Sequence, residues 1–313
     1  MKFTFKGGTA LMLLLGSTKR LSIDIDIIVH DKVELTQIFD NLVTKQGFTR
    51  YELQKRNNSS DIAKAHYKFY YTPVHTSGMV EDYVLLDILY EESHYSKIIE
   101  MPVDSIFVKQ DGAPIKVAVP CHEDILGDKL TAFAPYTTGI PYEKGGVARS
   151  MEIIKQLYDI GSLTKIVSDT GIISNTFNRF AKTELGYRKL DPTISTVLED
   201  IYQTALHIST RGEDGKGEIG HLKRGIDQVR QFIFSESYTY DKAITDASKA
   251  AYMVKVIQHG IASIEKFADP KQIKDATLGP SYHKKLHQLK KSNPEAFFYW
   301  YQADLIEKAQ NKD

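Results

Sequence analysis

The chain has 313 residues, of which 42% are hydrophobic and 26% charged, as is ordinary for a globular protein of one or two domains. Forty basic and forty acidic residues give zero formal net charge, so no overall electrostatic attraction to nucleic acid is expected. The single cysteine, Cys121, excludes an internal disulfide framework, and no apolar run reaches the roughly 20 residues that span a bilayer. We therefore expect a cytoplasmic protein without membrane contact.

The chain begins with a glycine turn between a strand and a helix. Residues 1–5 predict a short strand, and Gly7-Gly8-Thr9 separates it from a helix-like apolar run at 10–15. Glycines in such a turn allow main-chain N–H groups to approach a phosphate, and the start of a helix adds favourable partial charge. Taken alone, the glycines fit an ordinary turn equally well.

An acidic strand follows the glycine turn. Residues 23–29 alternate apolar and polar side chains, which predicts a strand with two unlike faces. Asp24 and Asp26 share one face, where two like charges repel each other. A hard cation held between them reverses this repulsion, and Mg²⁺ is the usual occupant of an all-oxygen site. A phosphate-binding turn followed by an Asp-x-Asp strand predicts a nucleotidyl transferase.

These motifs also resemble a known family. The string KGGTAL, a short helix and then RLSIDIDIIV are similar to the AbiEii-type nucleotidyltransferase toxins, a branch of the DNA polymerase β superfamily. Family members usually carry a helix before the first strand, so this N-terminus is expected to be short. Arg20 and Ser22 lie on the approach to the acidic strand, where Arg20 either contacts phosphate or forms a salt bridge.

The following elements predict the rest of a sheet. One helix and three strands are expected at 32–46, 48–54, 65–72 and 81–90. Tyr67, Phe69 and Tyr71 share a face of the second of these strands. They fit either the hydrophobic core and sheet surface or the stacking of a nucleobase.

Asp87 interrupts the hydrophobic strand expected at 81–90. A lone carboxylate in such a run is costly to bury unless a partner or an ion receives it. Asp87 fits an acid at a sheet edge or one paired with a lysine. Beside Asp24 and Asp26 it also fits a third metal ligand on an adjacent strand, and the family resemblance implies this second role.

Two helices after the sheet carry further motifs. Strand-like pieces at 105–108 and 115–119 precede Pro120, after which helices are expected. The helix expected at 123–133 contains Lys129, which by itself would be an ordinary surface lysine. Family members carry a helix of the form E-x-L-x-x-x-K-L, whose lysine contacts the phosphates of the nucleotide. That motif is matched by Glu123 and Lys129.

The helix expected at 149–160 ends in a second motif. Its last residues, Leu157-Tyr158-Asp159-Ile160, are similar to the family's fourth motif, in which a helix closes with D-L-Y-D-L. Asp159 keeps the second acid of that motif. Gln156 stands where the first acid is common and is not assigned to the site.

Beyond residue 161 the sequence predicts helices only. They are expected at 164–173, 194–209, 220–234, 242–264, 282–290 and 294–308. The turn-rich segments 135–146 and 209–220 are expected to be flexible loops. The fold class is therefore α+β. A polymerase β-like nucleotidyltransferase domain with a mixed, twisted sheet at 1–165 would be followed by a C-terminal α-helical bundle domain at 166–313.

Together the motifs predict a metal-dependent enzyme that transfers an NMP from an NTP to an acceptor hydroxyl and releases pyrophosphate. Two Mg²⁺ ions, or Mn²⁺ in their place, would be held by Asp24, Asp26 and Asp87. The expected catalytic residues are Asp24, Asp26, Asp87, Lys129 and Asp159. The expected nucleotide-binding residues are Gly7, Gly8, Thr9, Arg20, Ser22 and Lys129.

The resemblance implies a toxin-like component of a toxin–antitoxin or phage-defence system, with a cognate antitoxin as partner. It also implies tRNA or another RNA as the acceptor. Transfer to a small molecule or a protein stays open, as does a catalytically silent binding scaffold with the same fold. No residue of the sequence indicates which NTP is preferred.

Overall fold

The computed structural model describes residues 1–15, 20–22, 24–31, 33–54, 64–74, 81–104, 112–188 and 193–310. The chain divides into two compact units, Met1–Cys121 and His122–Asp313. From the sequence we expect a domain boundary after residue 165 instead. The difference arises because α3 (His122–Ala132) packs on α5 (Thr170–Arg188), while α4 (Ser150–Thr164) packs on later helices of the second unit.

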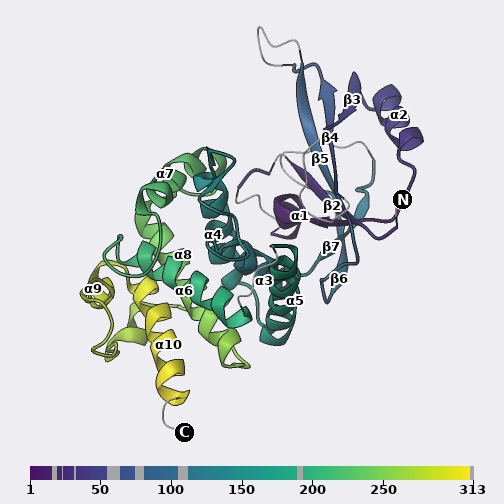
Figure 1. Ribbon diagram of the computed structural model, residues 1–313. Coiled ribbons are helices and arrows are strands. Elements are labelled where there is room, and N and C mark those ends of the chain that lie inside the picture. Colours follow the sequence, from purple (N-terminus) through teal and green to yellow (C-terminus); the bar gives the residue numbers. More distant parts are fainter. Residues whose placement is uncertain are drawn as a thin grey trace. The chain divides into compact units, whose positions relative to one another are not determined.

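Unit 1 contains a mixed sheet, which is seven-stranded within the described residues and agrees with the expected α+β class (Figure 1). The strand order is β3-β4-β5-β2-β1-β7-β6. The β2–β5 and β1–β7 pairs are parallel and the other pairs are antiparallel. The strands are β1 (Thr4–Lys6), β2 (Ile25–Val29), β3 (Arg50–Leu53), β4 (Lys64–Tyr71), β5 (Asp82–Tyr90), β6 (Ile98–Pro102) and β7 (Lys116–Pro120).

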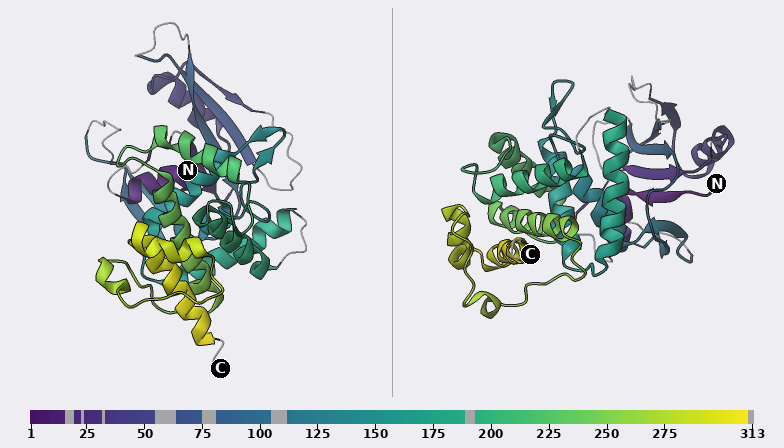
Figure 2. Two further views of the ribbon diagram at one scale, coloured as in Figure 1. Left: turned by 90° about the vertical axis from the view of Figure 1, so that its left-hand side faces the viewer. Right: turned by 60° about the horizontal axis from the view of Figure 1, so that its bottom comes forward.

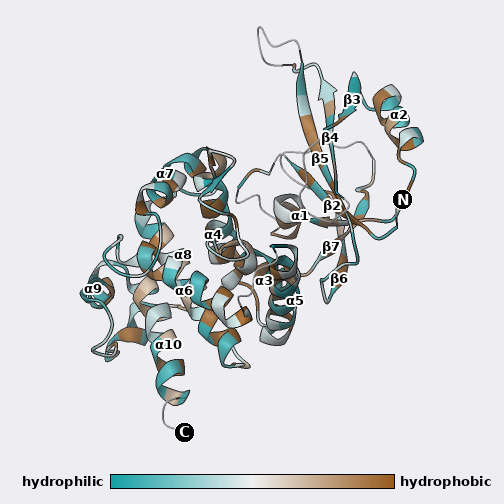
Figure 3. Ribbon diagram, viewed as in Figure 1, coloured by the Kyte–Doolittle hydropathy of each residue, from teal (hydrophilic) through white to brown (hydrophobic). Residues whose placement is uncertain are grey.

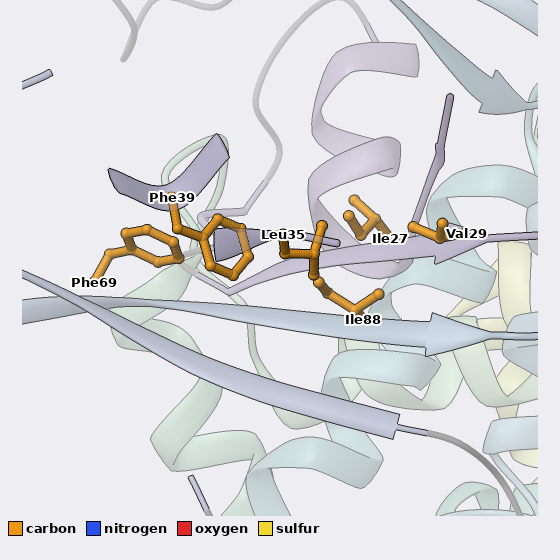
Figure 4. Packing of buried hydrophobic residues seen from close by; sticks show 6 residues of the cluster. All are labelled: Ile27, Val29, Leu35, Phe39, Phe69 and Ile88. Carbon is orange, nitrogen blue, oxygen red and sulfur yellow. The ribbon is translucent and has the colours of Figure 1, made fainter. Parts of the chain in front are cut away.

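Hydrophobic and polar residues both occur along the helix α2 (Thr36–Lys45), as the colours of Figure 3 show. The hydrophobic residues of this amphipathic helix pack against residues of β2, β4 and β5. The ring centroid of Phe39 on α2 lies 5.0 Å from that of Phe69 and 4.7 Å from that of Tyr67, both on β4. Ile27 and Ile88 complete the cluster, as Figure 4 shows for the buried members. Tyr67 and Phe69 are therefore core residues, which is the first of the two roles expected for them.

Because side chains alternate along a strand, neighbours of the core residues along a strand project from the opposite face of the sheet. Ile27 and Ile88 belong to the core, so Asp26 and Asp87, their chain neighbours, project from the other face. The alternation that predicts β2 from sequence thus places Ile27 and Asp26 on opposite faces.

Some expected elements of unit 1 differ from the structure. The edge strand β6 is not predicted from sequence. It ends in Pro102, which lacks an N–H and is tolerated only at an edge or at the end of a strand. The strand expected at 105–108 lies outside the described residues.

Unit 2 is helical apart from the short β8–β9 hairpin. Besides α3, α4 and α5 it contains α6 (Ile194–Ser209), α7 (Ile219–Val229), α8 (Tyr240–Gln258), α9 (Lys284–Ser292), α10 (Pro294–Gln310), the 3₁₀ turns η1 (Arg230–Phe232) and η2 (Pro270–Ile273), and the strands β8 (Glu143–Lys144) and β9 (Val147–Ala148). Every residue of α8 from 243 to 256 is buried, and α8 packs on α4, α6 and α10 (Figure 2). A helix buried on all sides is the central element of its unit. In the portion of the chain that the structure describes, no helix is both long and apolar enough to cross a bilayer.

The two segments expected to be flexible loops are instead held by specific hydrogen bonds. The guanidinium of Arg188 donates to the main-chain carbonyls of Thr137 and Gly139, both at 2.6 Å. In the second segment, the hydroxyl of Thr210 donates to the carbonyl of Asp214 at 3.1 Å. Glycine content indicated the turns correctly, but these polar anchors come from residues that local composition does not identify.

A buried charged cluster lies along α8. The hydroxyl of Tyr238 donates to Asp246 Oδ2 at 3.0 Å, and Lys249 Nζ lies 3.8 Å from Asp246 Oδ1. The fully buried side chain of Lys249 also pairs with Glu295 at 2.8 Å. Burial raises the pKa of Asp246 to about 7, although the charge of Lys249 opposes the rise.

We expect Asp246→Asn to weaken the pH dependence of stability. Between about pH 4 and about pH 7 the folded protein keeps the Asp246 proton and the unfolded chain loses it, so the free energy of unfolding falls as pH rises through this window. Thermal unfolding at about pH 5 and about pH 8 should show a larger drop for the wild type than for the variant. Equal drops would contradict the assignment.

Candidate functional site

The glycines that follow β1 form the start of a helix. Helix α1 (Gly7–Leu14) begins directly after β1, so Gly7, Gly8 and Thr9 are its first turn rather than a separate turn. No side chain caps this end, and the first turn contains no acidic residue. N–H groups in a first helical turn have no partner within the helix and carry partial positive charge. The start of α1 is therefore chemically suited to an anion.

Gly7 lies directly against the carboxylate of Asp26. Its φ of +67° is in the left-handed region, and a Cβ at this position would lie 2.5 Å from Asp26 Oδ2. Both the backbone conformation and the available space therefore require glycine. The carboxylate of Asp26 thus sits beside the positive end of α1.

Gly8 makes room for two further residues of the predicted nucleotide site. A Cβ on Gly8 would lie 2.5 Å from Ser22 Oγ and 3.1 Å from a guanidinium nitrogen of Arg20. Arg20 itself is only 8% exposed. The hydroxyl of Thr9 donates to the main-chain carbonyl of Asp24. The structure therefore brings the predicted nucleotide-binding residues of unit 1 together at the start of α1.

Asp26, Asp87 and His66 occupy one row across three adjacent strands. Asp26 on β2 is the register partner of Asp87 on β5, which in turn is the partner of His66 on β4. Directly opposite residues on neighbouring strands, about 4.8 Å apart, point to the same face of a sheet. The two carboxylates are therefore neighbours on one face. Asp24 lies just before β2 at a bend and is exposed.

The acidic residues do not form a compact metal cluster. Among the residues that the structure describes, no group of three or more His, Cys, Asp or Glu side chains could hold a metal ion as placed. His66 Nδ1 donates to Asp87 Oδ1 at 2.7 Å, which directs that oxygen toward β4. The donor chemistry fits a hard divalent cation, because carboxylates on adjacent strands offer only oxygen ligands and repel each other without a cation.

In unit 2, Lys129 on α3 and Asp159 on α4 form a buried ion pair. Lys129 Nζ lies 3.0 Å from Asp159 Oδ2, and these side chains are 7% and 1% exposed. Lys129 Nζ also donates to Gln156 Oε1 at 2.9 Å. The lysine is therefore held in one position by two side chains of a single helix.

His66 and Gln156 are the residues that sequence reasoning did not assign to the site. His66 is 21 residues from Asp87 in sequence, and only the register of the antiparallel β4–β5 pair brings them together. The position of Gln156 in the sequence could have assigned it to the site. It precedes Asp159 by three residues on a helix, which places both side chains on one face.

A serine, a histidine and a glutamate also approach one another in unit 2. Ser150 Oγ lies 3.0 Å from His221 Nδ1, and His221 Nε2 lies 3.6 Å from Glu143 Oε1. These are the residue types of a hydrolase triad. Ser150 is only 2% exposed, however, so a substrate cannot reach its hydroxyl. The contact instead joins α4 to α7.

An uncapped glycine helix start beside neighbouring carboxylates on a mixed sheet is the arrangement expected of a nucleotidyl transferase. The family model for the nucleotidyl transferase AbiEii toxin of type IV toxin–antitoxin systems matches residues 1–231. The chain therefore belongs to the AbiEii nucleotidyl transferase toxin family, and the resemblance drawn from its motifs is confirmed. No match was found among the curated proteins.

The family match ends before unit 2 does. It stops within the 3₁₀ turn η1, so α8, α9 and α10 lie beyond the matched residues. The buried helix α8 packs on α4, which carries Asp159. The support of Asp159 therefore includes a helix outside the matched region.

Proposed function

We propose that the chain is a metal-dependent nucleotidyltransferase that transfers an NMP from an NTP to an acceptor hydroxyl, with release of pyrophosphate. Family membership supports nucleotidyl transfer by a toxin of a toxin–antitoxin system. The observation that best supports the site is the register pair Asp26–Asp87 beside Gly7 at the start of α1. We infer a polymerase β-like domain at 1–165, extending beyond the sheet to the two motif-bearing helices, and a helical bundle domain at 166–313.

The proposed metal ligands are Asp24, Asp26 and Asp87, with two Mg²⁺ ions, or Mn²⁺, as the cations. Bound cations would supply charge stabilisation at the attacking and leaving oxygens of the in-line displacement. Asp87 is the proposed acceptor of the proton from the acceptor hydroxyl.

The start of α1 is the proposed phosphate cradle. Main-chain N–H groups of Gly7, Gly8 and Thr9 would bind the β- and γ-phosphates, as helix starts bind phosphates elsewhere. Arg20 and Ser22, which lie against Gly8, would extend this set of donors. Because a Cβ on either glycine would meet a neighbouring side chain, the cradle admits no larger residue there.

Lys129 is the proposed group that neutralises negative charge as pyrophosphate departs. An ammonium group serves this purpose as a point charge. Asp159 and Gln156 hold Nζ of Lys129 in place, so the lysine loses little conformational entropy during the reaction. In this proposal Asp159 acts through Lys129.

The proposed acceptor is tRNA or another RNA, and the proposed partner is a separate antitoxin that neutralises the activity. Membership of a type IV toxin–antitoxin family supports the existence of an antitoxin. We also propose a cytoplasmic location, with which the single, buried cysteine Cys121, which forms no disulfide, is consistent.

The function is tested by incubating the purified chain with each NTP, labelled at the α-phosphate, together with Mg²⁺ and either total RNA or total protein. We expect label in RNA from one preferred NTP, and loss of labelling with EDTA. Label in the protein fraction or in small molecules would overturn the RNA acceptor. Absence of all labelling, together with no Mg²⁺-dependent thermal shift by any NTP, would favour a silent scaffold.

A further inference from the structure

We propose that His66 is a positioning residue of the transfer site: it binds one oxygen of Asp87 and so presents the other oxygen toward Asp26. This inference rests on the proposed function, since the orientation of Asp87 matters for transfer only if that carboxylate binds a cation. Neither the sequence motifs nor the family match assigns a role to His66.

The contact between the two side chains is close and largely shielded from water. His66 Nδ1 lies 2.7 Å from Asp87 Oδ1, and the two side chains are 11% and 27% exposed. An ionised carboxylate only accepts hydrogen bonds, so the imidazole donates from Nδ1. A hydrogen bond to a charged acceptor is stronger than one between neutral groups, and shielding strengthens it further.

The order of the strands gives this hydrogen bond a direction. β5 lies between β4 and β2, so His66 and Asp26 flank Asp87 from opposite sides. His66 binds Oδ1 of Asp87 on the side of β4. We therefore infer that Oδ2 of Asp87 is the oxygen presented on the side of β2, where Asp26 lies. A divalent cation shared by Asp26 and Asp87 needs an oxygen on that side.

The same row continues on the other side of Asp26. Lys6 on β1 is the register partner of Asp26, so the row reads Lys6, Asp26, Asp87, His66. Two acids thus lie between two nitrogen bases. A lysine on a flexible stem can balance charge without fixing direction, whereas the short, planar histidine side chain fixes both the distance and the orientation of its acceptor. His66 is therefore suited to orient the carboxylate of Asp87.

Groups that hydrogen-bond to metal ligands govern metal affinity. Losing such a partner typically weakens metal binding by about 10- to 100-fold, because the ligand side chain is no longer held in its binding orientation. We therefore expect His66→Leu to weaken divalent-cation binding by at least about tenfold. His66→Asn, whose amide can still donate to Asp87, should recover part of the loss.

The experiment titrates the metal-stripped, full-length protein with Mn²⁺ and measures free Mn²⁺ by electron paramagnetic resonance. All variants are titrated at the same pH, about 8, and in the same buffer. His30→Leu is the matched control. His30 also contacts carboxylates, those of Asp31 and Glu92, but its side chain is 67% exposed and it lies outside the row. We expect the control to bind Mn²⁺ like the wild type.

Activity provides a second measurement. The Mn²⁺ concentration for half-maximal transfer should rise for His66→Leu, while transfer at saturating Mn²⁺ should approach the wild-type rate. The melting temperature of the metal-free variant should stay close to that of the wild type. Should His66→Leu fail to fold, His66→Ser takes its place in the titration, because its short side chain fits the strand but cannot reach Asp87.

The outcomes separate this inference from the proposed function. Equal Mn²⁺ affinity in the wild type and the His66 variants would overturn the positioning role and leave the site intact. Absence of Mn²⁺ binding by the wild type, or binding that Asp26→Asn leaves unchanged, would overturn the metal site itself.

Discussion

Asp26→Asn is expected to abolish nucleotidyl transfer while leaving the protein folded. Asparagine keeps the shape that fits against Gly7, but it lacks the charge needed to bind a divalent cation beside Asp87. We expect the transfer rate to fall by at least about a thousandfold, or about 4 kcal/mol of transition-state stabilisation. The melting temperature of the metal-free protein should stay close to that of the wild type, because the substitution removes both the repulsion from Asp87 and the attraction to the start of α1. Labelled-NTP transfer and thermal unfolding measure the two effects.

The matched control is Asp31→Asn, which makes the same chemical change five residues away on an exposed side chain. Its transfer rate should equal that of the wild type. Undiminished transfer by Asp26→Asn would show that Asp26 is not part of the catalytic site. Loss of folding in that variant would show that the carboxylate stabilises the sheet.

Periodicity predicts the acidic strands because their two faces differ in chemistry. Alternation along 23–29 indicated β2, and a lone acid in a hydrophobic run indicated that Asp87 belongs near Asp26. The structure makes them register partners on parallel strands. Sequence could not supply that register, since β2 and β5 are far apart in the chain and their pairing depends on the whole sheet order.

Features set by distant partners were missed or misjudged. Nothing local distinguishes His66 from a surface histidine, because its role depends on Asp87 of the neighbouring strand. The segment at 135–146 has the composition of a flexible loop, yet Arg188 of a later helix binds its carbonyls. Local sequence thus indicates where the chain turns, but it does not indicate what holds the turn.

The domain boundary expected from the motifs differs from the boundary between the two packed units, and the helices α3 and α4 show why. Lys129 and Asp159 were assigned to the transferase domain by motif, whereas α3 and α4 belong to the helical unit by contacts. Helix α8, beyond the family match, packs on α4 and is buried throughout its middle. The helix that carries Asp159 therefore packs on a part of this chain that the family model does not match.

The Lys129–Asp159 pair carries the largest expected effect on stability. Asp159→Leu leaves the buried ammonium of Lys129 with Gln156 as its remaining contact among those described above, and breaking a buried pair in this way costs about 3–5 kcal/mol. Lys129→Met should also be strongly destabilising, because it leaves a buried carboxylate. Urea unfolding of the wild type and both variants measures these losses. Lys242→Met, which breaks the more exposed pair with Glu236, should cost no more than about 1 kcal/mol.

The double variant Lys129→Met/Asp159→Leu separates the structural role of the pair from its proposed chemical role. Replacing both charges with apolar side chains leaves no buried charge at this position, so most of the lost stability should return. Transfer should remain lost, because no positive charge is left to meet the departing pyrophosphate. Recovery of transfer in the double variant would show that the pair serves folding alone. Stable single variants would show that water reaches the pair in solution.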